Sequence, residues 1–141
     1  MTGKLYGIGV GPGDPELLTV KAKGMLEGAA VIAYPVNRRG EESTAMEIVR
    51  GAVDVSGKRV IELIFSMDPD DNVRRRCRSD AVKELAGILD EGQDIAMVTL
   101  GDVGVYSTYM YVDEEIKGLG YETEVVPGIP SFCSGAAKAR I

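Results

Sequence analysis

The sequence predicts an α/β fold with a mainly parallel sheet of five strands flanked by helices. Continuous apolar runs rich in β-branched residues recur along the chain, as expected for strands that are buried on both faces. Segments with helical spacing separate these runs, and this alternation is typical of a parallel sheet covered by crossover helices. The expected strands are Leu5–Val10, Ala30–Tyr34, Arg59–Phe65, Ile95–Leu100 and Tyr121–Val126.

The first two expected helices have recognisable beginnings. Asp14 is expected to cap a helix whose first residue is Pro15, because proline lacks the N–H that would be unpaired there. This helix is predicted to run to about residue 27, with Leu17, Leu18, Met25 and Leu26 facing inward. Thr44, followed three residues later by Glu47, fits a capping box for a helix that ends near residue 53.

Two further helices are expected after a polar loop at residues 66–72. Apolar side chains at helical spacing predict one over 79–91, which Gly92 closes. The second is expected over 106–117 and ends at Gly118. The chain stops at Ile141 at the apparent start of a further helix, so we expect these 141 residues to be one domain of a longer protein.

Composition excludes several classes of function. There is no histidine, so His-based catalytic triads and imidazole metal sites are excluded, and no metal site is expected. A net charge of −6 opposes binding to nucleic acid, which depends on Lys and Arg. No apolar run approaches the ~20 residues of a membrane span, and Cys77 and Cys133 are not clustered, which favours a cytoplasmic protein with free thiols. The basic cluster 74–76 is expected to be a solvated surface.

The stretch "LYGIGVGPGDPELLTVKA" raises the question of a phosphate loop. The GxGxxG pattern fails in both registers, because Pro12 or Asp14 stands where the third glycine should be. No GK[ST] follows, Pro12 has no N–H to donate, and Asp14 is negatively charged. A nucleotide-binding, flavodoxin-like domain is therefore disfavoured, and the loop instead allows close approach to its backbone.

Several loops of small residues follow the expected strands. The second strand ends at Pro35, the fourth in "GDVGVY" and the fifth in "PGIPS". Because the carboxyl ends of parallel strands meet at one edge, we expect these loops to converge with the glycine loop. Together they predict a cleft for a large planar or extended ligand, held mainly by backbone groups.

Three segments, "GIGVGPGDPELLT", "TLGDVGVYSTYMY" and "VVPGIPSF", resemble the signature regions of the tetrapyrrole methylases. The resemblance implies S-adenosylmethionine as cofactor, a homodimer, and two α/β domains, of which 1–141 would be the first and the second would be absent. "YPVNRRGEESTAMEIV" and "YSTYMY" look most like the C20-methyltransferases that act on precorrin-2 or cobalt-precorrin-2 in cobalamin biosynthesis. One departure is Val103, where many members have proline.

The resemblance also implies site residues. Those expected to bind the cofactor are Pro12, Leu100, Gly101, Asp102, Val105, Ser107, Thr108, Pro130 and Ser131. Gly11 and Asp14 are expected at the tetrapyrrole substrate. Arg38 and Arg39 are expected there from topology alone, because they follow the end of the second strand at the carboxyl edge and a guanidinium suits the many ring carboxylates. No catalytic base is assigned: Asp14, Asp102 and Tyr106 remain open, and Tyr109 and Met110 read as core or cleft wall.

Two alternatives remain. One is a uroporphyrinogen-III-type methyltransferase of the same family, which the segment "YPVNRRGEEST" disfavours. The other is a binding or dimerisation domain without activity of its own. Methylases of ribosomal RNA and of a modified protein histidine share the architecture, and the acidic balance weighs against the RNA version.

Overall fold

The computed structural model describes residues 2–101 and 108–129. Its elements alternate strand and helix, as the sequence predicts. The strands are β1 Lys4–Gly9, β2 Val31–Val36, β3 Arg59–Ile64, β4 Ile95–Thr99 and β5 Glu122–Val126. The helices are a 3₁₀ turn η1 Pro15–Leu17, α1 Val20–Gly28, α2 Thr44–Ala52, α3 Asp71–Asp90 and α4 Thr108–Gly118.

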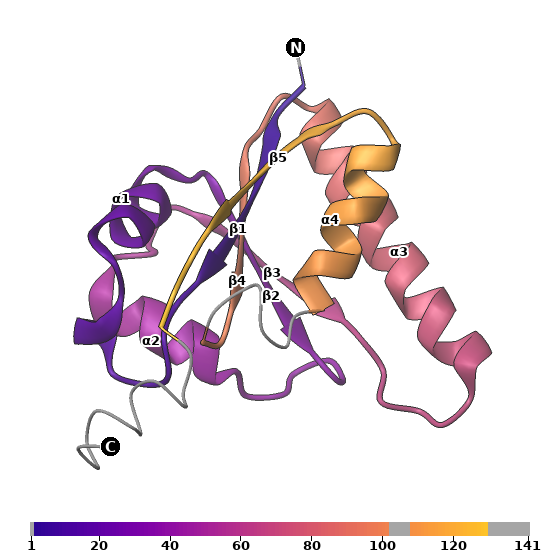
Figure 1. The fold of residues 1–141 in the computed structure, drawn as a ribbon, viewed down its shortest axis with the longest axis horizontal. Coiled ribbons are helices and arrows are strands. Elements are labelled where there is room, and N and C mark those ends of the chain that lie inside the picture. Colours follow the sequence, from indigo (N-terminus) through magenta and orange to yellow (C-terminus); the bar gives the residue numbers. More distant parts are fainter. Residues whose placement is uncertain (1, 102–107, 130–141) are drawn as a thin grey trace.

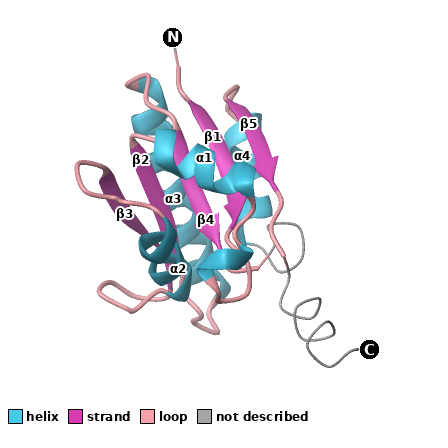
Figure 2. Ribbon diagram, turned by 90° about the vertical axis from the view of Figure 1, so that its left-hand side faces the viewer, coloured by secondary structure: helices cyan, strands magenta, loops and turns pink. Residues whose placement is uncertain are grey.

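The five strands form one sheet in the order β3-β2-β4-β1-β5, and every neighbouring pair is parallel. β1 lies between β4 and β5, with Leu5 aligned to Ile95 on one side and to Thr123 on the other. Figure 2 shows the strands side by side with helices in front of and behind them. The predicted parallel α/β sheet is therefore confirmed.

Two helical layers cover the sheet (Figure 1). The crossovers from β1 to β2 and from β2 to β3 run in one direction across the sheet, and those from β3 to β4 and from β4 to β5 run in the other. Because such crossovers are right-handed, α1 and α2 cover one face and α3 and α4 cover the opposite face.

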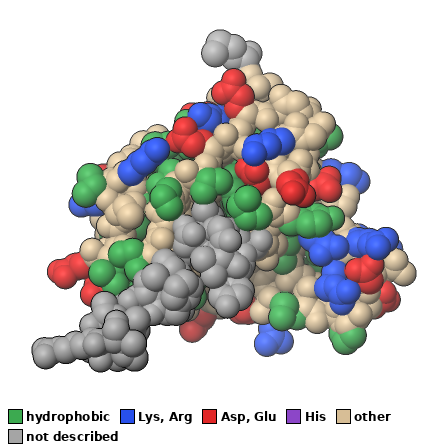
Figure 3. Space-filling view, in the orientation of Figure 1, with side chains coloured by type: hydrophobic (Ala, Val, Ile, Leu, Met, Phe, Trp, Pro, Cys, Tyr) green, Lys and Arg blue, Asp and Glu red, His purple; other side chains and the backbone are tan. Residues whose placement is uncertain are grey.

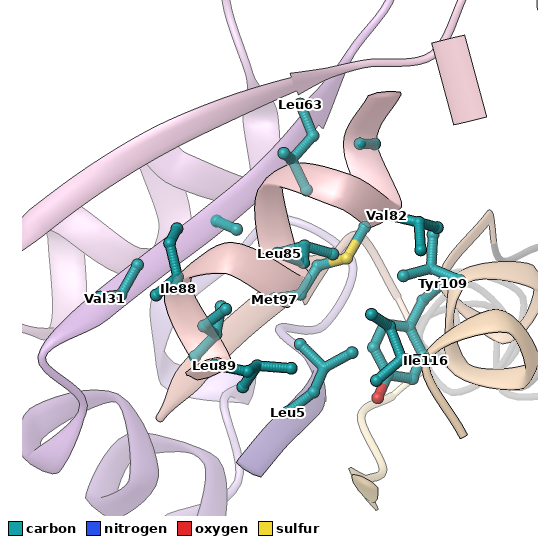
Figure 4. Packing of buried hydrophobic residues seen from close by; sticks show 14 of the residues in the cluster. Leu5, Val31, Leu63, Val82, Leu85, Ile88, Leu89, Met97, Tyr109 and Ile116 are labelled. Atoms are coloured by element: carbon teal, nitrogen blue, oxygen red, sulfur yellow. The ribbon is translucent and has the colours of Figure 1, made fainter. Parts of the chain in front are cut away.

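Each layer encloses its own apolar core. Alternation along β2 divides its side chains, since Val31 and Ala33 join the core under α3 and α4 while Ile32 joins the core under α1 and α2. Figure 4 shows α3 side chains such as Leu85 facing Met97 of the sheet.

The expected first helix is broken, which corrects the prediction of one helix from Pro15 to about residue 27. Asp14 caps only the short turn η1, and Leu18 and Thr19 are extended, with ψ of 131° and 155°. Thr19 then caps α1 by accepting a hydrogen bond from the Ala22 N–H at 3.1 Å. A threonine side chain that competes for backbone donors favours such a restart over a continuous helix.

Two other helix beginnings differ from prediction. Ser43, rather than Thr44, caps α2 and accepts a hydrogen bond from the Met46 N–H at 3.2 Å. Helix α3 begins at Asp71, eight residues before the predicted start, because Asp70 caps it through the Asn72 N–H at 2.9 Å. The predicted start of α4 at Tyr106 lies outside the described residues.

The parallel arrangement places every strand's carboxyl end at one edge of the sheet, the lower edge in Figure 1. From this edge, β1 and β2 lead to helices on one face, whereas β3 and β4 lead to helices on the other. Neighbouring strands in the order β3-β2-β4-β1 are therefore followed by helices on opposite faces of the sheet. Such divergence opens crevices at the carboxyl edge, where open α/β sheets bind ligands.

Candidate functional site

The loops that follow β1 and β4 are hydrogen-bonded to one another. The Gly11 N–H donates to the Gly101 carbonyl at 3.1 Å, and the Gly101 N–H donates to the Gly11 carbonyl at 2.8 Å, as an isolated antiparallel bridge. Both residues have positive φ, 83° and 73°, which favours glycine. This pair of hydrogen bonds holds the glycine loop against the end of β4.

The end of β5 packs onto the same point. A Cβ added to Gly128 would lie 2.4 Å from the Gly101 carbonyl oxygen and 2.7 Å from the carbonyl of Gly9. Only a residue without a side chain allows three segments to approach so closely. For the described residues, the prediction that these three loops converge is confirmed.

Main chain and the side chains of Thr99 and Leu100 lie at this convergence. The Thr99 Oγ1 is buried with no hydrogen-bond partner among the described residues, and beside it the Leu100 side chain is 52% exposed. Pro12 is half-buried, and nothing lies within 4 Å of the position of a Cβ on exposed Gly13. An orphaned hydroxyl next to an exposed apolar side chain fits a ligand with polar and apolar parts, such as the expected S-adenosylmethionine.

Of the other predicted site residues, Asp14 and Thr108 lie within the described part of the chain. Asp14 is exposed, and its carboxylate accepts a hydrogen bond from the Glu16 N–H at 2.9 Å as the cap of η1. Thr108 is exposed at the first turn of α4. The predicted residues Asp102, Val105, Tyr106, Ser107, Pro130 and Ser131 lie outside the described residues.

Arg38 and Arg39 lie in the loop after β2, at the carboxyl edge as predicted. Their side chains are 88% and 79% exposed. The Nε of Arg38 lies 3.8 Å from Glu41, and a terminal nitrogen of Arg39 lies 3.6 Å from Glu62. Ion pairs this exposed contribute little to stability, so both guanidinium groups remain accessible.

A cavity of about 300 Å³ lies at the carboxyl ends of β2 and β3. Apolar, neutral polar and charged side chains line it: Pro35, Val36, Asn37, Glu41, Phe65, Ser66, Met67, Arg74, Arg78 and Thr108. The sequence interpretation left residues 74–76 on the surface; Arg74 is 36% exposed there and also lines this cavity. The signal that finds both arginines is the cap at Asp70, because a helix from Asp71 puts positions 74 and 78 on one face.

Tyr109 is a core residue, as the sequence favours. It is fully buried, its hydroxyl donates to the Asp113 carboxylate at 3.2 Å, and Lys117 lies 3.0 Å from the same carboxylate group. Burial, together with the negative charge of Asp113, raises the pKa of Tyr109 far above its ordinary value. The ring packs where a Cβ on Gly7 would be, so this glycine lets α4 approach β1.

Across 2–101 and 108–129, no three His, Cys, Asp or Glu side chains gather closely enough to hold a metal ion. In the same ranges, no helix has the length and apolar character needed to cross a membrane.

The chain matches a known family over nearly its whole length. The family profile described as "Tetrapyrrole (Corrin/Porphyrin) Methylases" matches residues 4–141. A probable cobalt-precorrin-2 C(20)-methyltransferase of Methanocaldococcus jannaschii is 39% identical over 98% of this chain. The cobalt-precorrin-2 C(20)-methyltransferase of Salmonella typhimurium is 33% identical over the whole of this chain.

A solved structure shares the fold. A cobalt precorrin-4 methyltransferase of cobalamin biosynthesis superposes with a TM-score of 0.70 at 28% identity, over 97% of this chain and 50% of its own. The chain likewise spans only 58% and 59% of the two curated relatives. The family resemblance of the sequence motifs is therefore confirmed.

Proposed function

The chain belongs to the tetrapyrrole methylase family, and on that premise we propose that it forms part of an S-adenosylmethionine-dependent C-methyltransferase. The substrate we propose is precorrin-2 or cobalt-precorrin-2, methylated at C20 in cobalamin biosynthesis. The names of the two curated relatives support this choice. The observation that carries the proposal is the contact of Gly9, Gly101 and Gly128 at one edge of the sheet.

We assign the methyl donor to this meeting of loops. The positions that would hold it are Pro12, Leu100 and Gly101, and the Thr99 hydroxyl, which has no hydrogen-bond partner within the described part of the chain, lies next to Leu100 in sequence. The backbone bridge between Gly11 and Gly101 fixes the two loops before any ligand arrives. A preformed site loses less conformational entropy on binding, which favours affinity.

Methyl transfer from the donor to the ring depends on aligning the two molecules and needs no nucleophile from the protein. S-adenosylmethionine supplies a methyl group already activated by its sulfonium, so the contribution of the chain is to bring donor and ring into line. Rigid strand ends suit that task, because small displacements of a reacting group cost much of the rate. Asp14 serves as the cap of η1, and Tyr109 is buried, so neither is proposed as the proton acceptor.

Arg38 and Arg39 are proposed to meet carboxylates of the ring. They lie at the carboxyl edge and are highly exposed. Replacing both with alanine is expected to weaken binding of the ring substrate and to leave the affinity for S-adenosylmethionine nearly intact. Calorimetric titration with each ligand measures this. Equal loss of both affinities, or loss of neither, would contradict the assignment.

A methyl-transfer assay tests the proposed function. The protein at the full length of its curated relatives is incubated with donor carrying a ¹³C-methyl group and with metal-free or cobalt-loaded precorrin-2. The proposal predicts one added methyl group by mass and a carbon resonance assigned to C20. A label at another ring carbon would contradict the C20 assignment, and unlabelled ring in both incubations would contradict the methyltransferase itself.

Calorimetric titration of the 141-residue chain and of the longer protein with S-adenosylmethionine provides a comparison. Donor binding by the longer protein and not by the 141 residues would support a site completed by further chain. Failure of both to bind the donor would favour a domain with a binding or dimerisation role alone.

A further inference from the structure

Arg78 lines the cavity at the ends of β2 and β3, and no anionic group among the described residues pairs with it. It has neither a hydrogen bond nor an ion pair among the described residues, and its Nε is buried and unsatisfied. We propose that Arg78 anchors a carboxylate side chain of the tetrapyrrole ring in this cavity. The inference rests on the proposed function, and it names a contact that neither the family motifs nor Arg38 and Arg39 supply.

The guanidinium of Arg78 is held in place by stacking. Its central carbon lies 4.4 Å from the centre of the Tyr111 ring on α4. Stacking orients the planar group and leaves its hydrogen-bond donors unused. A half-buried cation with no anionic partner is unfavourable in the free protein, and a bound carboxylate relieves that cost.

Arg74, the other arginine that lines the cavity, already has hydrogen-bond partners within the protein. One terminal nitrogen of Arg74 donates to the carbonyl oxygens of Asp68 and Pro69 at 2.7 and 2.9 Å. Its second terminal nitrogen donates to the Asp71 carboxylate at 3.1 Å. Arg74 therefore secures the loop before α3 and shapes the cavity wall. Figure 3 shows Lys and Arg side chains gathered with acidic ones at the lower right, where the first half of α3 lies in Figure 1.

The remaining lining suits an acidic side chain on a short aliphatic stem. Phe65 and Met67 provide apolar surface, and Asn37 provides an amide. The only lining carboxylate among the described residues, Glu41, accepts from the Asn37 amide at 3.4 Å and lies 3.8 Å from Arg38. Asn37 and Arg38 therefore offset part of the negative charge of Glu41, and Glu41 does not pair with Arg78. A lining of mixed apolar and polar side chains, in which Arg78 is the guanidinium without an ion pair among the described residues, fits a carboxylate on one or two methylene groups.

The cavity also lies where the ring would reach it. It opens at the carboxyl edge that carries the bridge of Gly11 and Gly101. Thr108, at the start of α4, lines it, and the segment between Gly101 and Thr108 joins the two regions in sequence. A large planar substrate whose reacting carbon lies at the donor site can therefore extend a peripheral carboxylate towards Arg78.

The test compares Arg78→Gln with Arg76→Gln in the full-length protein. Arg76 is exposed on the same helix and does not line the cavity, so it controls for the loss of one positive charge from α3. Anaerobic absorbance titration with metal-free precorrin-2 measures ring affinity, and calorimetry measures the affinity for S-adenosylmethionine. Arg78→Gln is expected to weaken ring binding about tenfold or more and to change donor affinity less than twofold. Arg76→Gln is expected to change neither.

A second variant separates anchoring from structure. Arg78→Lys keeps the charge and loses the planar fork, so we expect it to recover part of the ring affinity. Thermal unfolding of each variant reports on folding. Ring affinity in Arg78→Gln equal to that in Arg76→Gln would overturn the inference and leave the proposed function intact. Parallel loss of ring affinity, donor affinity and melting temperature would also overturn it, and a wild-type protein that binds no ring would overturn both.

Discussion

Gly128→Ala is predicted to disturb the meeting of three loops by a single methyl group. The new Cβ would lie 2.4 Å from the Gly101 carbonyl oxygen, whereas ordinary contacts begin near 3.4 Å, so one segment must move by about 1 Å. The atoms in the way are backbone atoms of two strand ends and cannot change rotamer. The displacement therefore falls on the hydrogen bonds that join Gly11 to Gly101.

The size of the effect follows from these contacts. Overpacking by one methyl group costs about 1–3 kcal/mol, and each of the two bridge hydrogen bonds contributes about 0.5–1.5 kcal/mol. We expect the free energy of unfolding to fall by about 1–3 kcal/mol, which lowers the melting temperature by about 3–10 °C for a domain of this size. Affinity for S-adenosylmethionine is expected to fall as well, because the bridge forms its proposed site.

The control is a glycine-to-alanine substitution at a position where the added methyl group has space. A Cβ on Gly87, in α3, meets nothing within 4 Å, so Gly87→Ala is expected to stabilise the protein by up to about 1 kcal/mol. Urea unfolding followed by circular dichroism compares the two variants. If Gly128→Ala unfolds at the wild-type urea concentration and binds the donor as the wild type does, the close contact of the three loops is refuted.

Three further results are expected. Tyr109→Phe removes the hydroxyl that donates to a buried carboxylate and should cost about 1–2 kcal/mol in urea unfolding; an unchanged midpoint would contradict that hydrogen bond's role. Ser43→Ala should destabilise the protein by about 1 kcal/mol and Thr44→Ala by much less, since only the former caps α2, and the reverse order would contradict the cap. The hydrogen bond to Asp90 raises the pKa of Tyr121, so its stabilising contribution is complete below pH 10 and lost as pH rises through the raised pKa. The stability difference between wild type and Tyr121→Phe should therefore shrink above pH 10, and a difference that grows with pH would contradict this sign.

The strands could be predicted from the sequence because short, continuous apolar runs are typical of strands buried on both faces of a parallel sheet. In β4, from Ile95 to Thr99, all five residues are buried, and a run of this kind has one stable place in a parallel sheet. Helix beginnings were harder, because several residues near each start can accept a backbone hydrogen bond. Thr19 and Ser43 were missed for this reason, since Asp14 and Thr44 offer equally plausible caps in sequence.

The glycine loops and the cavity around Arg78 also differ in how far the sequence predicts them. The convergence of the glycine loops follows from topology, since parallel strands share a carboxyl edge, and a sequence reveals that much. The environment of Arg78 depends on where α3 begins, on the register between α3 and α4 that brings Tyr111 beneath it, and on the pairing that occupies Arg74. The start of α3 has a local signal in Asp70, whereas the register and the pairing are tertiary features without a signature in the run of arginines.

The most direct test of the central claim is to map where S-adenosylhomocysteine, the product form of the donor, touches the full-length protein. Backbone amide resonances are followed during titration. The account predicts the largest changes at Gly11, Gly101 and Gly128 at the carboxyl edge of the sheet. Changes centred instead on Gly3 and Gln93, which lie together at the amino edge, would contradict it.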